Sequence, residues 1–210
     1  MRLLQVKDLG LIEYGRAHDL QLNLVDERAQ DKIPDTLLLL EHPHVITLGK
    51  RMKDLSFKVD NIQVYKVERG GEATYHGPGQ LVGYLIVDLN SMNMSIREFV
   101  QKIEEVLIRT LKDFDIYAER VEGYPGVWVK DKKIASIGLA LKKWITFHGF
   151  ALNVNTDLDY FKLIRPCGLD PEVMTSMEKI LKTKVDMDKV KKLVVKKMLE
   201  VFHYTLTDHY

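Results

Sequence analysis

The stretch of sequence that decides the fold runs from residue 127 to residue 153. It reads Val127-Trp-Val-Lys-Asp-Lys-Lys-Ile-Ala-Ser-Ile-Gly-Leu-Ala-Leu-Lys-Lys-Trp-Ile-Thr-Phe-His-Gly-Phe-Ala-Leu-Asn153. β-Branched and aromatic residues fill three parts of it, which predicts strands over residues 127–129, 133–141 and 145–153. The turns, Lys130-Asp-Lys132 and Lys142-Lys143, are too short to hold a crossover helix. We therefore expect an antiparallel meander, and a doubly wound parallel sheet is disfavoured.

Further strands and amphipathic helices surround this meander. Extended segments are predicted at residues 37–41, 45–48, 63–67 and 81–89. Apolar residues at helical spacing predict helices over about 95–112, with Ser95 and Glu98 as a capping box, and over about 188–202. A weaker helix is expected over 14–30, and Thr175 with Glu178 predicts the capping box of a short helix ending at Leu181. Helices at the beginning, middle and end of hairpin-linked strands predict an α+β domain.

The last of these helices is expected to bury one face and to expose lysines on the other. Val190, Leu193, Val194, Met198 and Val201 form the predicted apolar face. The predicted opposite face is solvated surface, or alternatively a partner-binding surface, and consists of Lys189, Lys191, Lys192, Lys196 and Lys197.

The composition is that of an ordinary globular chain. Of the 210 residues, 46% are apolar and 29% charged, which excludes wholesale disorder and predicts a single domain over 1–210. The 31 Lys and Arg nearly cancel the 30 Asp and Glu, so no basic field is available to gather nucleic acid. Charge near the N-terminus disfavours a secretory signal, and the apolar runs are too short to cross a membrane. The lone Cys167 can form no internal disulfide, so a reducing cytoplasm is the expected compartment.

A glycine-rich segment marks the first candidate binding element. The segment Arg69-Gly-Gly-Glu-Ala-Thr-Tyr-His-Gly-Pro-Gly-Gln80 lies between two strand-like runs. Glycines let the main chain approach a ligand closely, whereas a simple tight turn, the alternative, needs only one or two of them. The segment matches neither a Walker A nor a dinucleotide fingerprint. We therefore expect a shaped binding loop.

The second candidate is the cysteine in Pro166-Cys-Gly168, a turn-forming context. A lone cysteine is commonly a small buried hydrophobe, and a nucleophilic role requires a cation or a base nearby. The candidate activators are Lys130, Lys132, Lys133, His76 and His148. Lys133 stands out because it opens a strand whose small residues leave room for a ligand. His148 is predicted to alternate to the other face of its strand, where packing is as good an explanation as chemistry.

A metal site is disfavoured. Glu41-His-Pro-His44 places two histidines one residue apart, as in some zinc sites, but a proline separates them and no third ligand is evident.

Together these segments resemble, in register, the signature segments of the lipoyl(octanoyl) transferases. The resemblance rests on the glycine-rich segment, Lys133-Ile-Ala-Ser-Ile-Gly138, Phe147-His-Gly-Phe-Ala-Leu-Asn153 and Pro166-Cys-Gly168, with Glu41-His-Pro43 and Thr175-Ser176 as flanking matches. It covers residues 37–181 and is looser beyond them. It implies a single catalytic domain of the biotin/lipoate protein ligase fold, α+β, with a largely antiparallel mixed sheet flanked by helices. Residues 182–210 would then be a C-terminal helical extension.

The resemblance also implies an acyltransferase that needs no cofactor and no metal. An octanoyl or lipoyl group would move from the thioester of acyl carrier protein to a lysine of a lipoyl domain or of the glycine-cleavage H protein, the first step of endogenous protein lipoylation. Cys167 matches the acyl-accepting thiol and Lys133 its dyad partner. The matching substrate-binding segments are Arg69, Gly70, Gly71, Glu72, Ala73, Thr74, Tyr75 and His76; Ser136, Ile137 and Gly138; and Gly149, Phe150 and Ala151.

Several alternatives stay open at this point. A lipoyl or octanoyl amidotransferase would use the same cysteine, whereas an ATP-dependent lipoate-protein ligase of the same fold would not need it. A non-catalytic carrier-binding module would need neither Cys167 nor Lys133. Either Lys133 or a histidine could deprotonate the acceptor lysine. Because acyl carrier proteins are acidic, we expect a basic docking patch drawn from Lys50, Arg51, Lys142 and Lys143.

Overall fold

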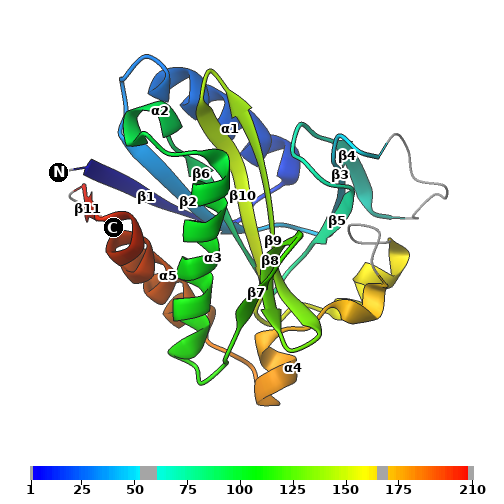
Figure 1. Ribbon diagram of the computed structural model, residues 1–210. Coiled ribbons are helices and arrows are strands. Elements are labelled where there is room, and N and C mark those ends of the chain that lie inside the picture. Colours follow the sequence, from blue (N-terminus) through cyan, green and yellow to red (C-terminus); the bar gives the residue numbers. More distant parts are fainter. Residues whose placement is uncertain (1, 53–60, 165–169, 208–210) are drawn as a thin grey trace.

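An eight-stranded mixed sheet forms the centre of the molecule (Figure 1). The computed structural model describes residues 2–52, 61–164 and 170–207. Within them the strand order is β11-β1-β2-β6-β10-β9-β8-β7. The bounds are β1 Arg2–Leu11, β2 Asp35–Glu41, β6 Gln80–Ile86, β7 Glu119–Val121, β8 Tyr124–Val129, β9 Lys132–Lys142, β10 Ile145–Asn153 and β11 Tyr204–Leu206.

The predicted meander is confirmed. Strands β8, β9 and β10 pair antiparallel in sequence order, and β10 continues antiparallel onto β6 and β6 onto β2. Parallel pairing occurs in this sheet only where β1 meets β2 and β11. The fold is therefore α+β with a mostly antiparallel mixed sheet, as the sequence predicts.

A smaller sheet lies beside the large one and carries part of the glycine-rich segment. Its order is β4-β3-β5, with β3 Val45–Leu48, β4 Gln63–Lys66 and β5 Ala73–His76. The expectation of one continuous loop over residues 69–80 is therefore wrong in its middle, because β5 pairs antiparallel with β3. The buried side chains of these strands pack against Phe161 and Ile164.

Both faces of the large sheet are covered, which explains the unbroken apolar run of β2. Leu37 and Leu39 join a cluster with helices α3 (Ile96–Lys112) and α5 (Met187–Phe202), whereas Leu38 and Leu40 pack against helix α1 (Tyr14–Arg28) on the opposite face. Side chains alternate along a strand, so a strand buried on both faces must be apolar at every position. Figure 1 shows α3 and α5 together on one side of the sheet.

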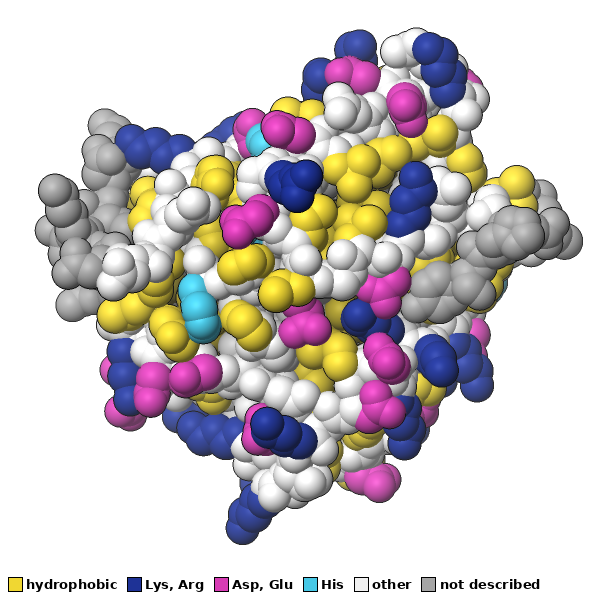
Figure 2. Space-filling view, turned by 180° about the vertical axis from the view of Figure 1, so that it is seen from behind, with side chains coloured by type: hydrophobic (Ala, Val, Ile, Leu, Met, Phe, Trp, Pro, Cys, Tyr) yellow, Lys and Arg dark blue, Asp and Glu magenta, His cyan; other side chains and the backbone are white. Residues whose placement is uncertain are grey.

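Short helices complete the fold. They are α2 Leu89–Met92, η1 Leu158–Leu163, η3 Pro171–Val173 and α4 Met177–Leu181. In the part of the chain that the structure describes, no helix is long and apolar enough to cross a membrane. The face seen in Figure 2 carries basic and acidic side chains close to one another, in keeping with the near-zero net charge.

The predicted helix signals are confirmed with two corrections. Ser95 and Glu98 form a reciprocal capping box at the start of α3. The cap of α4 is Ser176 instead of Thr175, and its side chain accepts a hydrogen bond from the Lys179 N–H. In α5 the exposed lysine face is wrong at Lys191, which is buried and binds Asp8 at 2.9 Å. Asp8 belongs to β1, so α5 contacts the large sheet at this lysine.

Some strand predictions were also incomplete. Strand β6 ends at Ile86, because Asp88 caps α2 with its side chain where the sequence predicts extended chain to residue 89. Strands β1, β7 and β11 were not predicted; β7 and β11 have only three residues each, and half-polar β1 lacks a strict alternation. A three-residue strand carries too little pattern to be recognised from sequence.

The two strands behind the candidate site approach each other unusually closely at glycines. A Cβ atom added to Gly149 of β10 would lie 2.1 Å from the Gly83 carbonyl oxygen of β6. That oxygen belongs to a paired central strand and cannot move away cheaply.

We therefore expect Gly149→Ala to lower the free energy of unfolding by about 2–3 kcal/mol, through overpacking against backbone. Urea unfolding at neutral pH measures this change. The matched control is Gly70→Ala, because a Cβ at Gly70 would meet no atom within 4 Å. Equal stabilities of the two variants would contradict the close approach.

Candidate active site

One cavity gathers most of the residues that the sequence predicts for the site. Its volume is about 350 Å³, which is in the range of small-molecule pockets. Of the predicted binding residues, the following line it: Arg69, Gly70, Gly71, Thr74, His76, Ser136, Ile137, Gly138, Gly149, Phe150 and Ala151, together with the predicted dyad residue Lys133. Glu72, Ala73 and Tyr75 do not line it, and Ala73 and Tyr75 instead face the core beside the small sheet.

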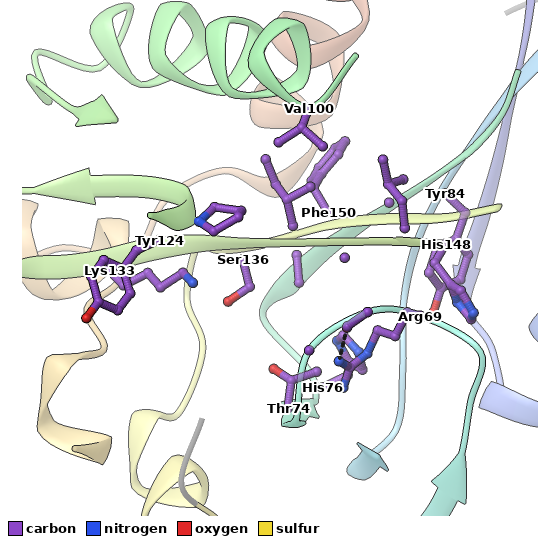
Figure 3. Close-up of a pocket in the computed structure, with 18 of the residues that line it drawn as sticks. Arg69, Thr74, His76, Tyr84, Val100, Tyr124, Lys133, Ser136, His148 and Phe150 are labelled. Atoms are coloured by element: carbon purple, nitrogen blue, oxygen red, sulfur yellow. Dashed lines mark hydrogen bonds between the residues drawn. The ribbon is translucent and has the colours of Figure 1, made fainter. Parts of the chain in front are cut away.

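The cavity also has walls that sequence reasoning missed. Tyr14 comes from α1, Ile96 and Val100 come from α3, and Tyr84 comes from β6. Figure 3 shows Lys133 and Tyr124 at one end of the cavity and Tyr84 and His148 at the other. These residues belong to elements far apart in the sequence, and no local motif marks them.

An irregularity in β9 turns Lys133 into the cavity. Val127 lies opposite Ala135, and Trp128 lies opposite Lys133, so Ile134 is an extra residue on β9. In a regular strand Lys133 would share a face with Ala135. The bulge instead puts Lys133 on the cavity side with Ser136, while Ala135 and Ile134 pack into the core next to α3. Bulges commonly re-aim a side chain next to an active site in this way.

The neighbours of Lys133 hold it in this orientation. A Cβ on Gly126 would lie 2.7 Å from Lys133 Cε, so a glycine there leaves room for the lysine stem. The Lys133 ammonium lies 5.6 Å from the Trp128 ring centre, and its side chain is buried. The Lys133 carbonyl accepts a hydrogen bond from the Thr175 N–H at 2.9 Å. This bond ties the chain that follows the Pro166-Cys-Gly168 motif to the start of β9.

Arg69 is fixed by several hydrogen bonds. Its guanidinium donates to the Thr47 carbonyl at 2.8 Å, to the Thr47 hydroxyl and to the Gly70 carbonyl. Because Thr47 lies on β3, the small sheet positions the first residue of the glycine-rich segment at the cavity.

Two buried, neutral histidines lie at the cavity: His76 lines it, and His42 contacts the lining residue Tyr84. His42 contacts the Ile12 carbonyl and the Tyr84 hydroxyl, each at 2.7 Å, and His76 contacts the Gln80 side chain at 2.7 Å. Burial lowers the pKa of His42 to about 4 and that of His76 to about 3. His44 points elsewhere and contacts the Tyr75 hydroxyl. The two histidines of Glu41-His-Pro-His44 therefore do not converge on a common site.

His148 occupies a strained position on β10. Its φ of +58° lies in the left-handed region, which a non-glycine residue rarely adopts within a strand. Its backbone N–H donates to the Gln21 side chain of α1. The sequence predicts that His148 lies on the face opposite Gly149 and Ala151, but its ring lines the same cavity as they do. Burial lowers the pKa of His148 to about 3. The imidazole is therefore neutral near pH 7.

Cys167 and its neighbours 165–169 lie outside the described residues. The described residues on either side are anchored near the cavity. Ile164 is buried beside Tyr75, and Met174 forms a bridge to Lys133.

Comparison with solved structures places the chain by its fold. It superposes on a putative lipoate protein ligase from T. acidophilum with a TM-score of 0.74 at 18% identity, covering 99% of this chain and 88% of that one. A biotin protein ligase from Aquifex aeolicus gives a TM-score of 0.54 at 13% identity, covering 97% and 69% of the two chains. At these identities the likeness shows a shared fold, that of the lipoate and biotin ligase catalytic domains.

Sequence comparison identifies the family. Residues 13–199 match the family model described as the lipoyl protein ligase A/B catalytic domain. A protein from Desulforamulus reducens is 46% identical, with 95% of this chain and 91% of that protein covered, and one from Caldicellulosiruptor saccharolyticus is 48% identical, with 95% and 88% covered. Both are named octanoyltransferase. The chain therefore belongs to the lipoyl protein ligase A/B catalytic domain family, which confirms the resemblance seen in its motifs.

The neutral histidines predict a loss of stability in weak acid. The unfolded chain takes up protons on His42 and His76 near pH 6.5, whereas the folded protein keeps both neutral down to about pH 4 and about pH 3. The free energy of unfolding is therefore not reduced by these two histidines above pH 6.5, and it falls as the pH drops below that value. Near pH 5 the two groups together lower the free energy of unfolding by up to ~3 kcal/mol for each pH unit of acidification.

Urea unfolding at pH 7.0, 6.0 and 5.0 measures this slope. In His42→Gln one of the two titrating imidazoles is removed. We therefore expect the part of the pH slope that comes from the two histidines to fall by roughly half, whatever the stability of the variant at pH 7. A free energy of unfolding that stays constant from pH 7 to pH 5 would show that the two imidazoles are not buried neutral.

Proposed function

We propose that this protein is an octanoyltransferase, an acyltransferase of protein lipoylation. It takes an octanoyl or lipoyl group from acyl carrier protein and passes it to a lysine of a lipoyl domain or of the glycine-cleavage H protein. The observation that carries the proposal is the buried Lys133, turned by a bulge into a cavity lined by the motif residues. The names of the curated relatives support it, and a structural neighbour is a lipoate ligase studied with its lipoyl domain.

We propose that residues 1–210 act as one catalytic domain. The segment 182–210, predicted as an extension, contributes α5 to the core beside α3 and β11 to the edge of the large sheet. These contacts support a single unit.

The chemistry needs two acyl transfers and no cofactor. In the first, the Cys167 thiolate attacks the thioester carbonyl of the donor, a new C–S bond forms, and the carrier thiolate leaves and takes up a proton. In the second, the acceptor amine loses a proton and attacks the Cys167 thioester, an amide forms, and the Cys167 thiolate leaves. The donor is already activated, so ATP is not required.

Lys133 is the better candidate for the base of these steps. His76 and His148, with pKa values of about 3, bind protons too weakly to accept one efficiently near pH 7. When the Lys133 amine takes the proton of the Cys167 thiol, the ammonium that forms stabilises the thiolate, and it can return this proton to the leaving carrier thiolate. We therefore assign the dyad to Cys167 and Lys133.

The cavity offers an apolar wall for the acyl chain. Phe150 and Val100 line it on the side of α3, and Ile137 lines it and packs against the same core cluster. Arg69, Thr74 and His76 face it from the glycine-rich segment. Each buried methylene contributes roughly 0.8 kcal/mol to binding. We propose that the acyl chain of the substrate lies along the apolar wall, with its thioester group toward Lys133.

Two of the four residues predicted for a docking patch lie close to a carboxylate. Lys142 binds Asp26 at 2.9 Å and Lys143 lies 3.9 Å from the same carboxylate, so much of their charge is offset. Lys50 and Arg51 are exposed, and Arg51 also lines the cavity. We propose that an acidic carrier docks at Lys50 and Arg51.

Thiols stay reduced in a reducing compartment such as the cytoplasm. We therefore propose that the enzyme is cytoplasmic.

Incubation with octanoyl-acyl carrier protein alone is expected to add one octanoyl mass to the protein, on Cys167, because thiolate attack needs only the activated donor. Intact-mass analysis with and without ATP, followed by peptide mapping, checks this. In Cys167→Ala we expect no adduct and no transfer to a lipoyl domain. Full transfer by Cys167→Ala without ATP would overturn the mechanism, and adducts only with ATP would favour a ligase.

Lys133→Ala is expected to slow alkylation of Cys167 by iodoacetamide at pH 7 by about tenfold or more, because the cation that favours the thiolate is lost. Pseudo-first-order kinetics by mass spectrometry measure the rate. Lys132→Ala is the matched control, since Lys132 is the adjacent residue and reaches the Glu172 carbonyl at the surface. Unchanged kinetics in Lys133→Ala would remove Lys133 from the activating role.

A further inference from the structure

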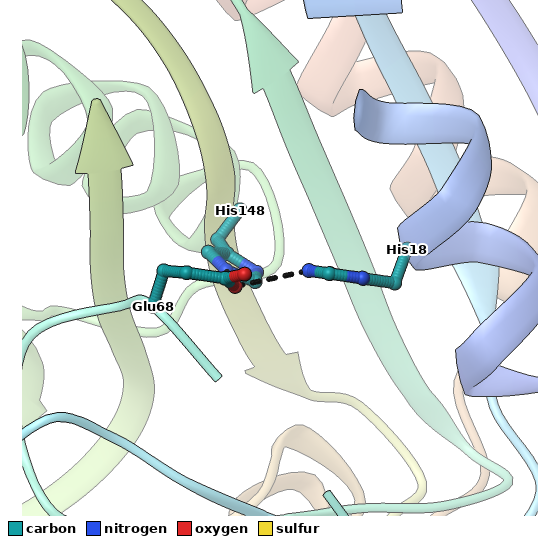
Figure 4. Close-up of side chains that lie close together, drawn as sticks. All are labelled: His18, Glu68 and His148. Atoms are coloured by element: carbon teal, nitrogen blue, oxygen red, sulfur yellow. Dashed lines mark hydrogen bonds and ion pairs between the residues drawn. The ribbon is translucent and has the colours of Figure 1, made fainter. Parts of the chain in front are cut away.

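Three side chains from distant parts of the sequence converge at the edge of the cavity. His18 comes from α1, Glu68 directly precedes Arg69, and His148 comes from β10 (Figure 4). The Glu68 carboxylate lies 3.0 Å from His18 Nε2 and 3.6 Å from His148 Nε2. One ligand atom from each residue lies within 4.8 Å of the other two.

His148 brings a buried ring nitrogen to this cluster. Its side chain is 3% exposed, and its Nε2 atom has no hydrogen-bond partner among the described residues. A buried polar atom without a partner costs free energy, and such atoms are rare in native structures. The same Nε2 atom lies 3.6 Å from the Glu68 carboxylate.

We propose that His18, Glu68 and His148 form a binding site for a zinc-class divalent cation. Zn²⁺ binds nitrogen and carboxylate oxygen at about 2.0–2.2 Å, so ligand atoms around a tetrahedral ion lie roughly 3.3 Å apart. The two distances to Glu68 lie on either side of this value. The two imidazole nitrogens lie within 4.8 Å of each other, and ion binding would draw them together. Two imidazoles and one carboxylate favour Zn²⁺ over Mg²⁺ or Ca²⁺, which prefer oxygen ligands.

The surroundings permit such an ion. Glu68 is 46% exposed and His18 is 20% exposed, which provides a path from solvent. The positive charge of Arg69 would repel a cation, but its guanidinium donates to the carbonyl groups of Thr47 and Gly70. The Glu68 carboxylate lies close to both imidazoles and would compensate part of the charge of the ion. Three protein ligands leave a fourth position for water.

A bound ion would join three elements that shape the cavity. It would link α1, the start of the glycine-rich segment and β10, and His148 is itself a lining residue. The site goes beyond the proposed acyl transfer, since neither Cys167 nor Lys133 takes part in it.

Isothermal titration with ZnCl₂ tests the site directly. The protein is the untagged full chain with Cys167→Ser, which removes the thiol as a competing ligand, and it is first stripped with a chelator that is then dialysed away. We expect one equivalent of Zn²⁺ with a dissociation constant below ~10 µM. Co²⁺ should give visible absorption bands of a four-coordinate site. Saturation should raise the melting temperature by several degrees.

The decisive comparison is between two histidine variants. His18→Gln should weaken Zn²⁺ binding at least tenfold, because one of three ligands is lost. His203→Asn, at the exposed C-terminal end of α5, removes a histidine elsewhere and should bind like the parent. Equal affinities of His18→Gln and the parent Cys167→Ser protein, or a dissociation constant of the parent above ~10 µM, would overturn the proposal. Neither result depends on transfer activity, so the proposed function can fail or succeed separately.

Discussion

The pairing of β10 with strands on both of its sides is the constraint on which the rest of the molecule depends. β10 binds β9 along one edge and β6 along the other, and it meets β6 so closely that only glycine is accommodated at Gly149. This contact sets the floor of the cavity. The bulge in β9 lies next to this paired strand: the extra residue Ile134 packs into the core with Ala135, and Lys133 turns toward the cavity.

The site combines a hydrophobic wall with a polar side whose histidines are neutral. Burial removes the imidazoles of His42, His76 and His148 from proton exchange near pH 7, although each lies at or close to the cavity. Among the described motif residues that line the cavity, Lys133 is the amine, and Arg69 is held by hydrogen bonds to Thr47 and Gly70. The same burial leaves His148 Nε2 without a hydrogen-bond partner in the described part of the chain, next to two further ligand atoms. Desolvation therefore underlies both the proposal that Lys133 is the base and the proposal of a cation site at His148.

Much of the fold follows from local pattern. The meander, α3 with its capping box and α5 were all predicted, since each has a long periodic segment or a short turn. The predictions were wrong or silent where a residue's environment comes from another layer. Lys191 is buried because Asp8 of β1 meets it, and β5 forms because β3 lies beside it. Of the candidate site, the motif segments were predicted, whereas Tyr14, Val100 and Tyr84 were not.

By itself the sequence determined the α+β class, the antiparallel meander, the family and the set of motif residues, because these depend on periodicity, turn length and residue identity. The tertiary structure decided which of those residues share a cavity. It turned Lys133 inward through one extra residue, directed Ala73 and Tyr75 into the core, and brought His18, Glu68 and His148 together from three separate elements. The physical reason is that side-chain direction depends on strand register and on packing between layers, neither of which a local pattern contains.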